Sequence, residues 1–162
     1  MKKSKRHTKK YQKNRKQKPK TREKKEVYTK QYIFIDGSAC PKSHTICAVY
    51  GDGRRDIRSF DFHVEPLQCE YVAFINTLKN IQHLKGDIII CSDSLAMVNQ
   101  INEGFSCASC YDYWIEAFRW FKPNMRLRWV RREDNPAGQF LEQRLRTIRH
   151  QLMKGYRKVY KS

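Results

Sequence analysis

The sequence lacks any hydrophobic stretch long enough to cross a membrane, and no apolar run follows its basic start as it would in a secretory signal peptide. We therefore expect a protein of the cytoplasm, a reducing compartment in which cysteines remain thiols. The sequence also lacks a glycine-rich phosphate-binding loop and any arrangement typical of a Ser–His–Asp triad. These absences argue against membrane proteins, disulfide scaffolds, P-loop proteins and serine hydrolases.

The six cysteines include one pair with the spacing of zinc ligands, Cys107 and Cys110. A structural zinc site needs four ligands, and the sequence has no second CxxC or HxxxH pair. The residues around the pair do not show the βαβ pattern that accompanies a redox-active CxxC motif. We therefore predict no zinc site, and the role of this pair stays open.

Residues 1–31 contain no leucine, isoleucine, phenylalanine or tryptophan. They hold 15 of the 34 lysines and arginines against two acidic residues, which gives this segment a charge of +13 out of +18. Such a segment buries too little apolar surface to offset the entropy lost on ordering. The chain is thus predicted to have three parts, which are a disordered basic arm (1–30), one folded domain (31–154) and a basic C-terminal tail (155–162).

The charge of the arm predicts a polyanionic partner, because each phosphate that a lysine or arginine neutralises releases condensed counterions. Nucleic acid is favoured over a membrane surface, since the arm has no tryptophan, phenylalanine or leucine to insert into lipid. A purely solubilising or targeting tail is the alternative. If the partner is nucleic acid, the arm residues expected to bind it are Lys2, Lys3, Lys5, Arg6, Lys9, Lys10, Lys13, Arg15 and Lys16.

Apolar periodicity in the remaining chain predicts an α/β domain. Strands are expected over residues 32–35, 45–50, 56–64, 87–92 and 125–130, and helices from Pro66 onward and over 94–103, 113–121 and 136–154. The first three strands follow each other directly and so form an antiparallel meander, whereas the last two require parallel crossovers. The expected fold is a five-stranded mixed sheet flanked by helices.

Three acidic residues fall at positions where this fold would bring them together. Asp36 and Asp93 end the first and fourth strands, and Glu70 lies one turn into the first long helix. Each acid alone is more often a turn, cap or solvated helix residue. Three carboxylates at one sheet edge, however, repel each other unless a cation neutralises them, and Mg²⁺ prefers such ligands. We therefore predict a site for Mg²⁺ or Mn²⁺.

The sequence resembles type 1 ribonuclease H, especially its reverse-transcriptase-like branch of bacteria and plants, over about residues 31–146. The resemblance depends on the order and spacing of four motifs rather than on any one of them. The motifs are Ile35-Asp36-Gly37-Ser38, Glu70-Tyr71 followed by Ala73, Ser92-Asp93-Ser94, and RWVRREDN (128–135), which is similar to the signature Trp-Val-x-Arg-Glu-x-Asn of the family.

This resemblance implies the strand order 3-2-1-4-5 and metal-dependent hydrolysis of the RNA strand in RNA–DNA hybrids. Asp36 would bridge two ions, Glu70 would hold the ion near the leaving oxygen, and Asp93 would position the other ion with its nucleophilic water. Two ions about 4 Å apart can clamp the attacking and leaving oxygens of a phosphodiester. Ser38 and Ser94, beside two of the acids, are expected to contact the nucleic acid.

The chain departs from the family at a fourth acid, which usually opens the last helix shortly after the asparagine. Either Gly138 or Gln139 occupies the corresponding place. Glu142, one turn beyond Gly138, is the preferred substitute, because residues four apart share a helix face. Asp134 is the next candidate, and the remaining alternative is that the fourth ligand is missing and one ion is held loosely.

Two functions follow from these observations. One is a metal-dependent endonuclease, here expected to be monomeric, that acts on RNA–DNA hybrids or on duplex RNA. The other is a nucleic-acid-binding module of the same fold whose catalytic activity is weak or lost. A third interpretation, a structural RNA-associated protein in which the arm is the main element, is less favoured.

The basic protrusion with which the family grips hybrids is not evident, since about ten non-basic residues separate Gly104 from the helix at Trp114. We expect the arm to supply the missing phosphate contacts. Removing residues 1–30 should therefore weaken binding to an RNA–DNA hybrid and flatten the dependence of log K on log[salt], measured by fluorescence anisotropy. An unchanged affinity and salt slope would mean that the arm has another role.

Overall fold

The computed structural model describes residues 29–159, with side chains up to residue 154, so nearly all of the predicted arm lies outside the described residues. The five strands are β1 (Gln31–Ala39), β2 (His44–Tyr50), β3 (Arg55–Phe60), β4 (Ile88–Ser92) and β5 (Met125–Trp129). They form one sheet in the order β3-β2-β1-β4-β5. Strands β1 to β3 are antiparallel, and β1, β4 and β5 are parallel. The predicted α/β fold and strand order are confirmed.

The pairing of β1 with β4 positions the first two acids. Ile35 pairs with Ser92 at the end of the parallel ladder. Asp36 and Asp93 each follow one residue later, so both lie beyond this last pair at the same edge of the sheet. The register therefore brings together two residues that are far apart in the sequence.

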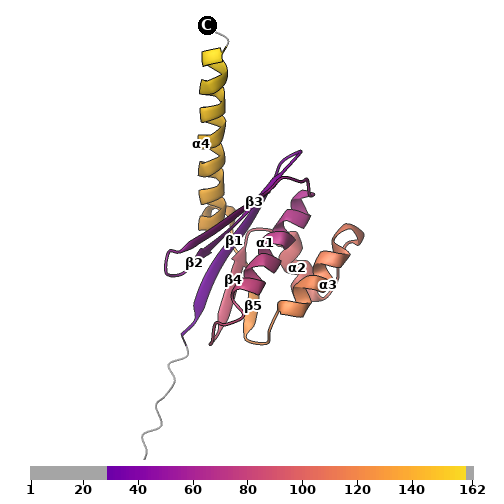
Figure 1. The fold of residues 1–162 in the computed structure, drawn as a ribbon. Coiled ribbons are helices and arrows are strands. Elements are labelled where there is room, and N and C mark those ends of the chain that lie inside the picture. Colours follow the sequence, from indigo (N-terminus) through magenta and orange to yellow (C-terminus); the bar gives the residue numbers. More distant parts are fainter. Residues whose placement is uncertain (1–28, 160–162) are drawn as a thin grey trace, which may run out of the picture.

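Helices cover the two faces of the sheet unequally (Figure 1). Helices α1 (Pro66–Asn80), α2 (Leu95–Glu103) and α3 (Tyr111–Trp120) pack on one face and enclose the main hydrophobic core. Helix α4 (Pro136–Val159) packs on the other face, where the buried cluster is small and contains Cys47, Ala137 and Leu141. Short 3₁₀ turns, η1 (Ala108–Cys110) and η2 (Arg132–Asp134), precede α3 and α4.

Local sequence explains where α1 and α2 begin and end. Pro66 occupies the first turn of α1, and a capping box joins Glu65 to Gln68, whose side-chain oxygen accepts a hydrogen bond from the Glu65 N–H. Gly104 ends α2 in the left-handed conformation with φ of 75°. No helix among residues 29–159 is both long and apolar enough to cross a membrane.

Several predicted boundaries differ from the structure, most of them by one or two residues. Strand β1 continues to Ala39 rather than ending at residue 35, because it pairs with β2 as far as His44, so Asp36 lies within the strand and not at its end. Strand β3 ends at Phe60 rather than at residue 64, because Phe60 pairs with His44, the first residue of β2, and later residues have no partner strand. Helix α3 begins at Tyr111 rather than at Tyr113. Helix α4 continues to Val159, past the predicted end at residue 154, since one glycine lowers helix propensity without abolishing it. Residues 155–159 of the predicted tail are thus helical.

Gly37 allows α1 to approach β1 closely. A Cβ atom at this position would lie 2.8 Å from the sulfur and carbonyl oxygen of Cys69, which is fully buried. No side chain larger than hydrogen therefore fits between the strand and the first turns of the helix. This contact fixes the part of α1 that carries Glu70.

Replacing Gly37 with alanine should displace α1 and destabilise the fold by about 1–3 kcal/mol, as overpacking of a core does. Urea denaturation measures this loss. Gly51→Ala is the matched control, because a Cβ there meets its nearest atom at an ordinary 3.4 Å. Equal stabilities of the two variants would contradict the proposed role of Gly37.

Candidate metal centre

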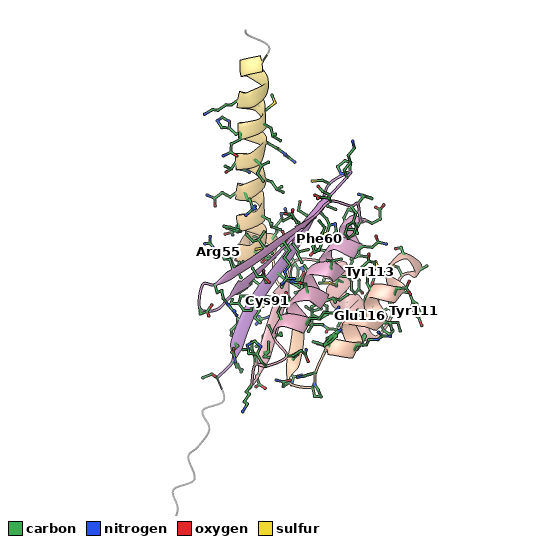
Figure 2. The ribbon with its side chains drawn as sticks, viewed as in Figure 1. Arg55, Phe60, Cys91, Tyr111, Tyr113 and Glu116 are labelled. Carbon is green, nitrogen blue, oxygen red and sulfur yellow. The ribbon has the colours of Figure 1, made fainter. Side chains whose placement is uncertain are left out.

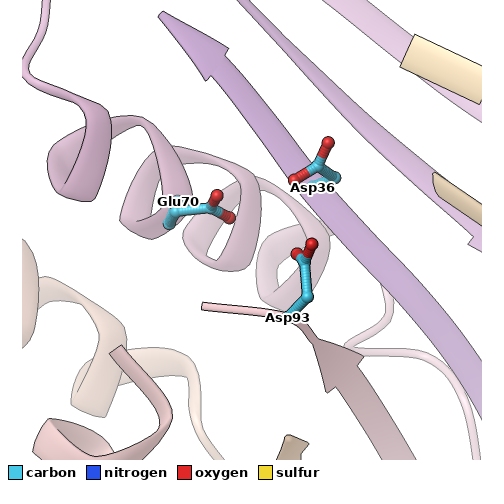
Figure 3. A group of neighbouring side chains, drawn as sticks. All are labelled: Asp36, Glu70 and Asp93. Carbon is cyan, nitrogen blue, oxygen red and sulfur yellow. The ribbon is translucent and has the colours of Figure 1, made fainter. Parts of the chain in front are cut away.

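Three carboxylates from separate elements meet at one place (Figure 3). Asp36 comes from β1, Glu70 from the N-terminal half of α1, and Asp93 from the residue that follows β4. One carboxylate oxygen of each residue lies within 4.8 Å of the other two. Among residues 29–159 no other group of three His, Cys, Asp or Glu side chains is close enough to share a metal ion.

Asn135 is the residue that orients this cluster. It is fully buried, and its side-chain amide donates hydrogen bonds to the Ile35 carbonyl at 2.9 Å and to Asp93 Oδ1 at 3.1 Å. Its side-chain oxygen accepts a hydrogen bond from the Ala137 N–H and so caps α4. One side chain thus ties together β1, Asp93 and the start of α4. The sequence motif contains Asn135, but the motif alone assigned it no role.

The backbone around Asp93 is fixed by its neighbours. The Ser94 N–H donates to Ser92 Oγ at 3.1 Å, and the Val130 N–H donates to the Ser92 carbonyl at 2.9 Å. The Trp129 indole N–H donates to the Asp93 carbonyl at 3.3 Å. The turn after β4 is therefore held on both sides, which keeps the Asp93 carboxylate directed at the other two acids.

The electrostatics of the cluster favour a bound cation. Burial, and then the charge of Asp93, raises the pKa of Asp36 from 3.8 to about 7. Burial, and then the charges of Asp36 and Asp93, raises the pKa of Glu70 from 4.5 to about 9. Glu70 Oε2 is buried and has no hydrogen-bond partner within the described chain. A divalent cation would satisfy this oxygen and offset the repulsion, and carboxylate oxygens are the ligands that Mg²⁺ and Mn²⁺ prefer.

Arg132 provides the nearest positive charge. Its Nη1 lies 3.7 Å from Asp93 Oδ2, and its guanidinium lowers the pKa values of Asp36 and Glu70 against the larger effects of burial. The Arg132 side chain is 71% exposed, so it lies at the open rim rather than inside the cluster. Its place in the sequence motif was the signal for this residue, although its proximity to Asp93 required the fold.

Gly138, rather than Gln139, faces the cluster at the place of the fourth acid. A Cβ at Gly138 would lie 3.4 Å from Asp36 Oδ2 and 3.8 Å from the Asn135 amide nitrogen. The Gln139 side chain turns away and donates to the Glu133 carbonyl. A carboxylate on residue 138 would enter the cluster directly, and in this chain that position carries only hydrogen.

The two candidate substitutes for the fourth acid form ion pairs elsewhere. The exposed Glu142 carboxylate pairs with Arg146 on the same helix, and Glu142 is not in the three-residue group. Asp134 pairs with Arg131 at 2.8 Å. Ser38 lies on β1 and Ser94 at the N-cap of α2, both partly buried. The predicted contacts from Lys2 to Lys16 lie outside the described residues.

Comparison with protein-family models gave no match, and neither did comparison with curated proteins. Solved structures, in contrast, resemble the fold. An RNase H1 from the halophilic archaeon Halobacterium salinarum gives a TM-score of 0.56 at 17% identity, over 67% of this chain and 91% of that one. An RNase H1 isolated from compost by metagenomics gives 0.61 at 19% identity, over 69% and 91% of the two chains.

The same compost enzyme in complex with an RNA/DNA hybrid gives a TM-score of 0.58 at 17% identity, over 65% of this chain and 88% of that chain. Likeness at such low identity establishes the fold alone. The chain therefore has an RNase H-like fold, with a cluster of three acids just beyond the last pair of the β1–β4 ladder.

The raised pKa values predict how stability depends on pH. Asp36 and Glu70 bind protons more tightly in the folded chain than in the unfolded chain, so their protonation stabilises the fold. This contribution to stability is complete below their ordinary pKa values of 3.8 and 4.5, and it is lost as the pH rises through their folded pKa values of about 7 and about 9. Thermal unfolding in EDTA should show a melting temperature that falls over this range, and Mg²⁺ should restore it most at high pH. The matched control is Asp36→Asn/Glu70→Gln, which should remove both the pH dependence and the Mg²⁺ effect. A wild-type curve parallel to that of the control would refute the electrostatic account.

Proposed function

We propose that this chain is an endonuclease that hydrolyses the RNA strand of RNA–DNA hybrids with bound Mg²⁺ or Mn²⁺. The observation that carries the proposal is the convergence of Asp36, Glu70 and Asp93 on one point within 4.8 Å. The RNase H-like fold supports it, because the acids occupy the sheet edge at which sites of α/β folds lie. The motif from Trp129 to Asn135 supports a place in the reverse-transcriptase-like branch.

In this proposal the chain contributes positioning and charge. Bound divalent ions supply a water with a lowered pKa and stabilise charge on the phosphate in the transition state. Asp36, Glu70 and Asp93 would hold the ions. Asp36 is proposed to be shared by both ions, with Glu70 serving the ion on the leaving-group side and Asp93 the ion on the side of the nucleophilic water. Asn135 holds Asp93 in orientation through its amide.

Arg132 is proposed to bind the phosphate next to the scissile bond. Its guanidinium is at the rim, mostly exposed, and within 3.7 Å of Asp93. A planar guanidinium matches the geometry of a phosphate and forms two parallel hydrogen bonds with it. The substrate is proposed to be bound as a hybrid by a monomer, with further phosphate contacts from the arm, Ser38 and Ser94.

A second candidate function rests on Gly138. Without a carboxylate at this position the site has one negative ligand fewer than the family pattern, so one of two ions would be held weakly. To supply the missing carboxylate, Glu142 would have to break its ion pair with Arg146. This observation favours, as the alternative, a nucleic-acid-binding module of the RNase H-like fold with weak or no hydrolysis.

A cleavage assay separates the two functions. Wild-type protein should cut a labelled RNA–DNA hybrid in Mg²⁺ or Mn²⁺, and Asp36→Asn should lower the rate by at least about 100-fold, the scale of losing one electrostatic group in a site. Asp112→Asn, which changes an exposed acid of α3 outside the cluster, is the matched control and should leave the rate within about twofold. Tight hybrid binding by wild type and Asp36→Asn without cleavage by either would establish the binding module instead.

A gain of function tests the assignment of residue 138. Gly138→Asp places a Cβ at ordinary contact distance from Asp36 and directs a carboxylate near the N-terminus of α4, where negative charge is favourable. The Mg²⁺ concentration that gives half-maximal cleavage should fall by about tenfold, as expected for one added ligand whose supporting shell is in place. Gln139→Asp is the control and should have no such effect. A larger gain from Gln139→Asp would reverse the assignment.

A further inference from the structure

Helix α4 leaves the body of the molecule after its first turns. It contacts β1, β2 and η2, and its distal half stands clear of the sheet (Figure 1). The side chains of that half as far as residue 154 project away from the body of the molecule (Figure 2). A helix gains most of its stability from packing an apolar face, and an isolated segment of this length is marginal in water. The distal half of α4 therefore lacks the packing that ordinarily stabilises a helix.

An apolar stripe runs along α4 and becomes exposed to solvent where the helix extends beyond the sheet. Its members, Leu141, Leu145, Ile148 and Leu152, are spaced by four, three and four residues, which is the spacing of a coiled-coil seam. Leu141 is 1% exposed, Leu145 is partly buried, Ile148 is 41% exposed and Leu152 is 67% exposed. The stripe that packs on β1 and β2 thus continues uncovered within residues 29–154.

The margins of this seam are positively charged. Arg144 and Arg149 flank it, and neither forms an ion pair with any residue that the structure describes. Glu142 is the single acid between residues 136 and 154, and it pairs with Arg146. In helical pairs such flanking charges select the partner, because opposite charges attract and like charges repel.

We propose that residues 141–154 of α4 bind an acidic amphipathic helix of a partner protein. Its leucine-type residues would cover Leu145, Ile148 and Leu152, and its carboxylates would pair with Arg144 and Arg149. This interaction is separate from the proposed nuclease function.

Other occupants fit the observations less well. A second copy would bring a chain of charge +18 and the same two arginines to the seam. The N-terminal arm has the same sign of charge and no apolar periodicity. Nucleic acid would pair with the arginines but would leave the exposed Ile148 and Leu152 without a partner. An acidic helix is the ligand that uses both the seam and its margins.

Synthetic peptides of about three heptads test the proposal with the full-length protein. The first has leucine at the seam positions and glutamate at the flanking positions. The second has the same seam flanked by lysine, and the third has the composition of the first in scrambled order. Measured by fluorescence anisotropy, the first peptide should bind at least about tenfold more tightly than either of the others. Added salt should weaken the binding of the first peptide.

Variants of α4 locate the binding surface. The double variant Ile148→Ala/Leu152→Ala keeps the helix propensity of α4, and it should lower the affinity for the first peptide by about tenfold or more. Arg144→Glu/Arg149→Glu should reverse the preference toward the lysine peptide. Gln143→Ala/His150→Ala, on the opposite face, is the matched control and should bind like wild type. Far-UV circular dichroism confirms that each variant retains its helix content.

Three outcomes would overturn the proposal. If the scrambled peptide bound as tightly as the first peptide, the protein would attract acidic peptides by charge alone. A dimer in sedimentation that Ile148→Ala/Leu152→Ala abolishes would mean that a second copy covers the seam. Loss of hybrid binding in Arg144→Glu/Arg149→Glu, with no peptide binding in wild type, would mean that α4 binds nucleic acid. None of these measurements involves cleavage, so the proposal and the nuclease function fail independently.

Discussion

The repulsion among three closely spaced carboxylates, one buried and two partly buried, is the interaction on which the account of this molecule depends. Burial and mutual proximity raise the pKa values of Asp36 and Glu70 to about 7 and about 9, so the cluster opposes its own ionisation. A fold ordinarily avoids such an arrangement, because an unpaired buried charge costs several kcal/mol. Here the fold enforces it, through the β1–β4 register, the close contact at Gly37 and the hydrogen bonds of Asn135. Structural features that converge on one unfavourable cluster are typical of a site that binds a cation.

Much of this architecture could be predicted from the sequence because it depends on local signals. Short apolar runs identified the buried strands, Pro66 and Gly104 marked helix ends, and the order of elements required a mixed sheet. Asp36 and Asp93 each follow the apolar run of a buried strand, and this was enough to expect them at one edge, although β1 continues past Asp36 to Ala39. To place Glu70 at the same edge, it was enough to expect that the first helix crosses over β1.

What could not be predicted depends on contacts between distant residues. The choice between Gly138 and Gln139 turned on the rotation of α4, which the buried Asn135 and Ala137 fix and which no periodicity specifies. The ion pair of Glu142 with Arg146 and the approach of Arg132 to Asp93 likewise required the tertiary structure. The end of β3 was misplaced because alternation continues beyond Phe60, whereas the partner strand does not.

The central claim is that Asp36, Glu70 and Asp93 together bind a divalent cation, and metal uptake tests it without reference to any substrate. Mn²⁺ binding should be followed by electron paramagnetic resonance of the free ion, with Mg²⁺ as competitor, for wild type and for Glu70→Gln. The account predicts Mn²⁺ uptake by wild type that Mg²⁺ displaces, and loss of at least about tenfold in affinity in the variant. Equal uptake by the two proteins, or none by wild type, would contradict it.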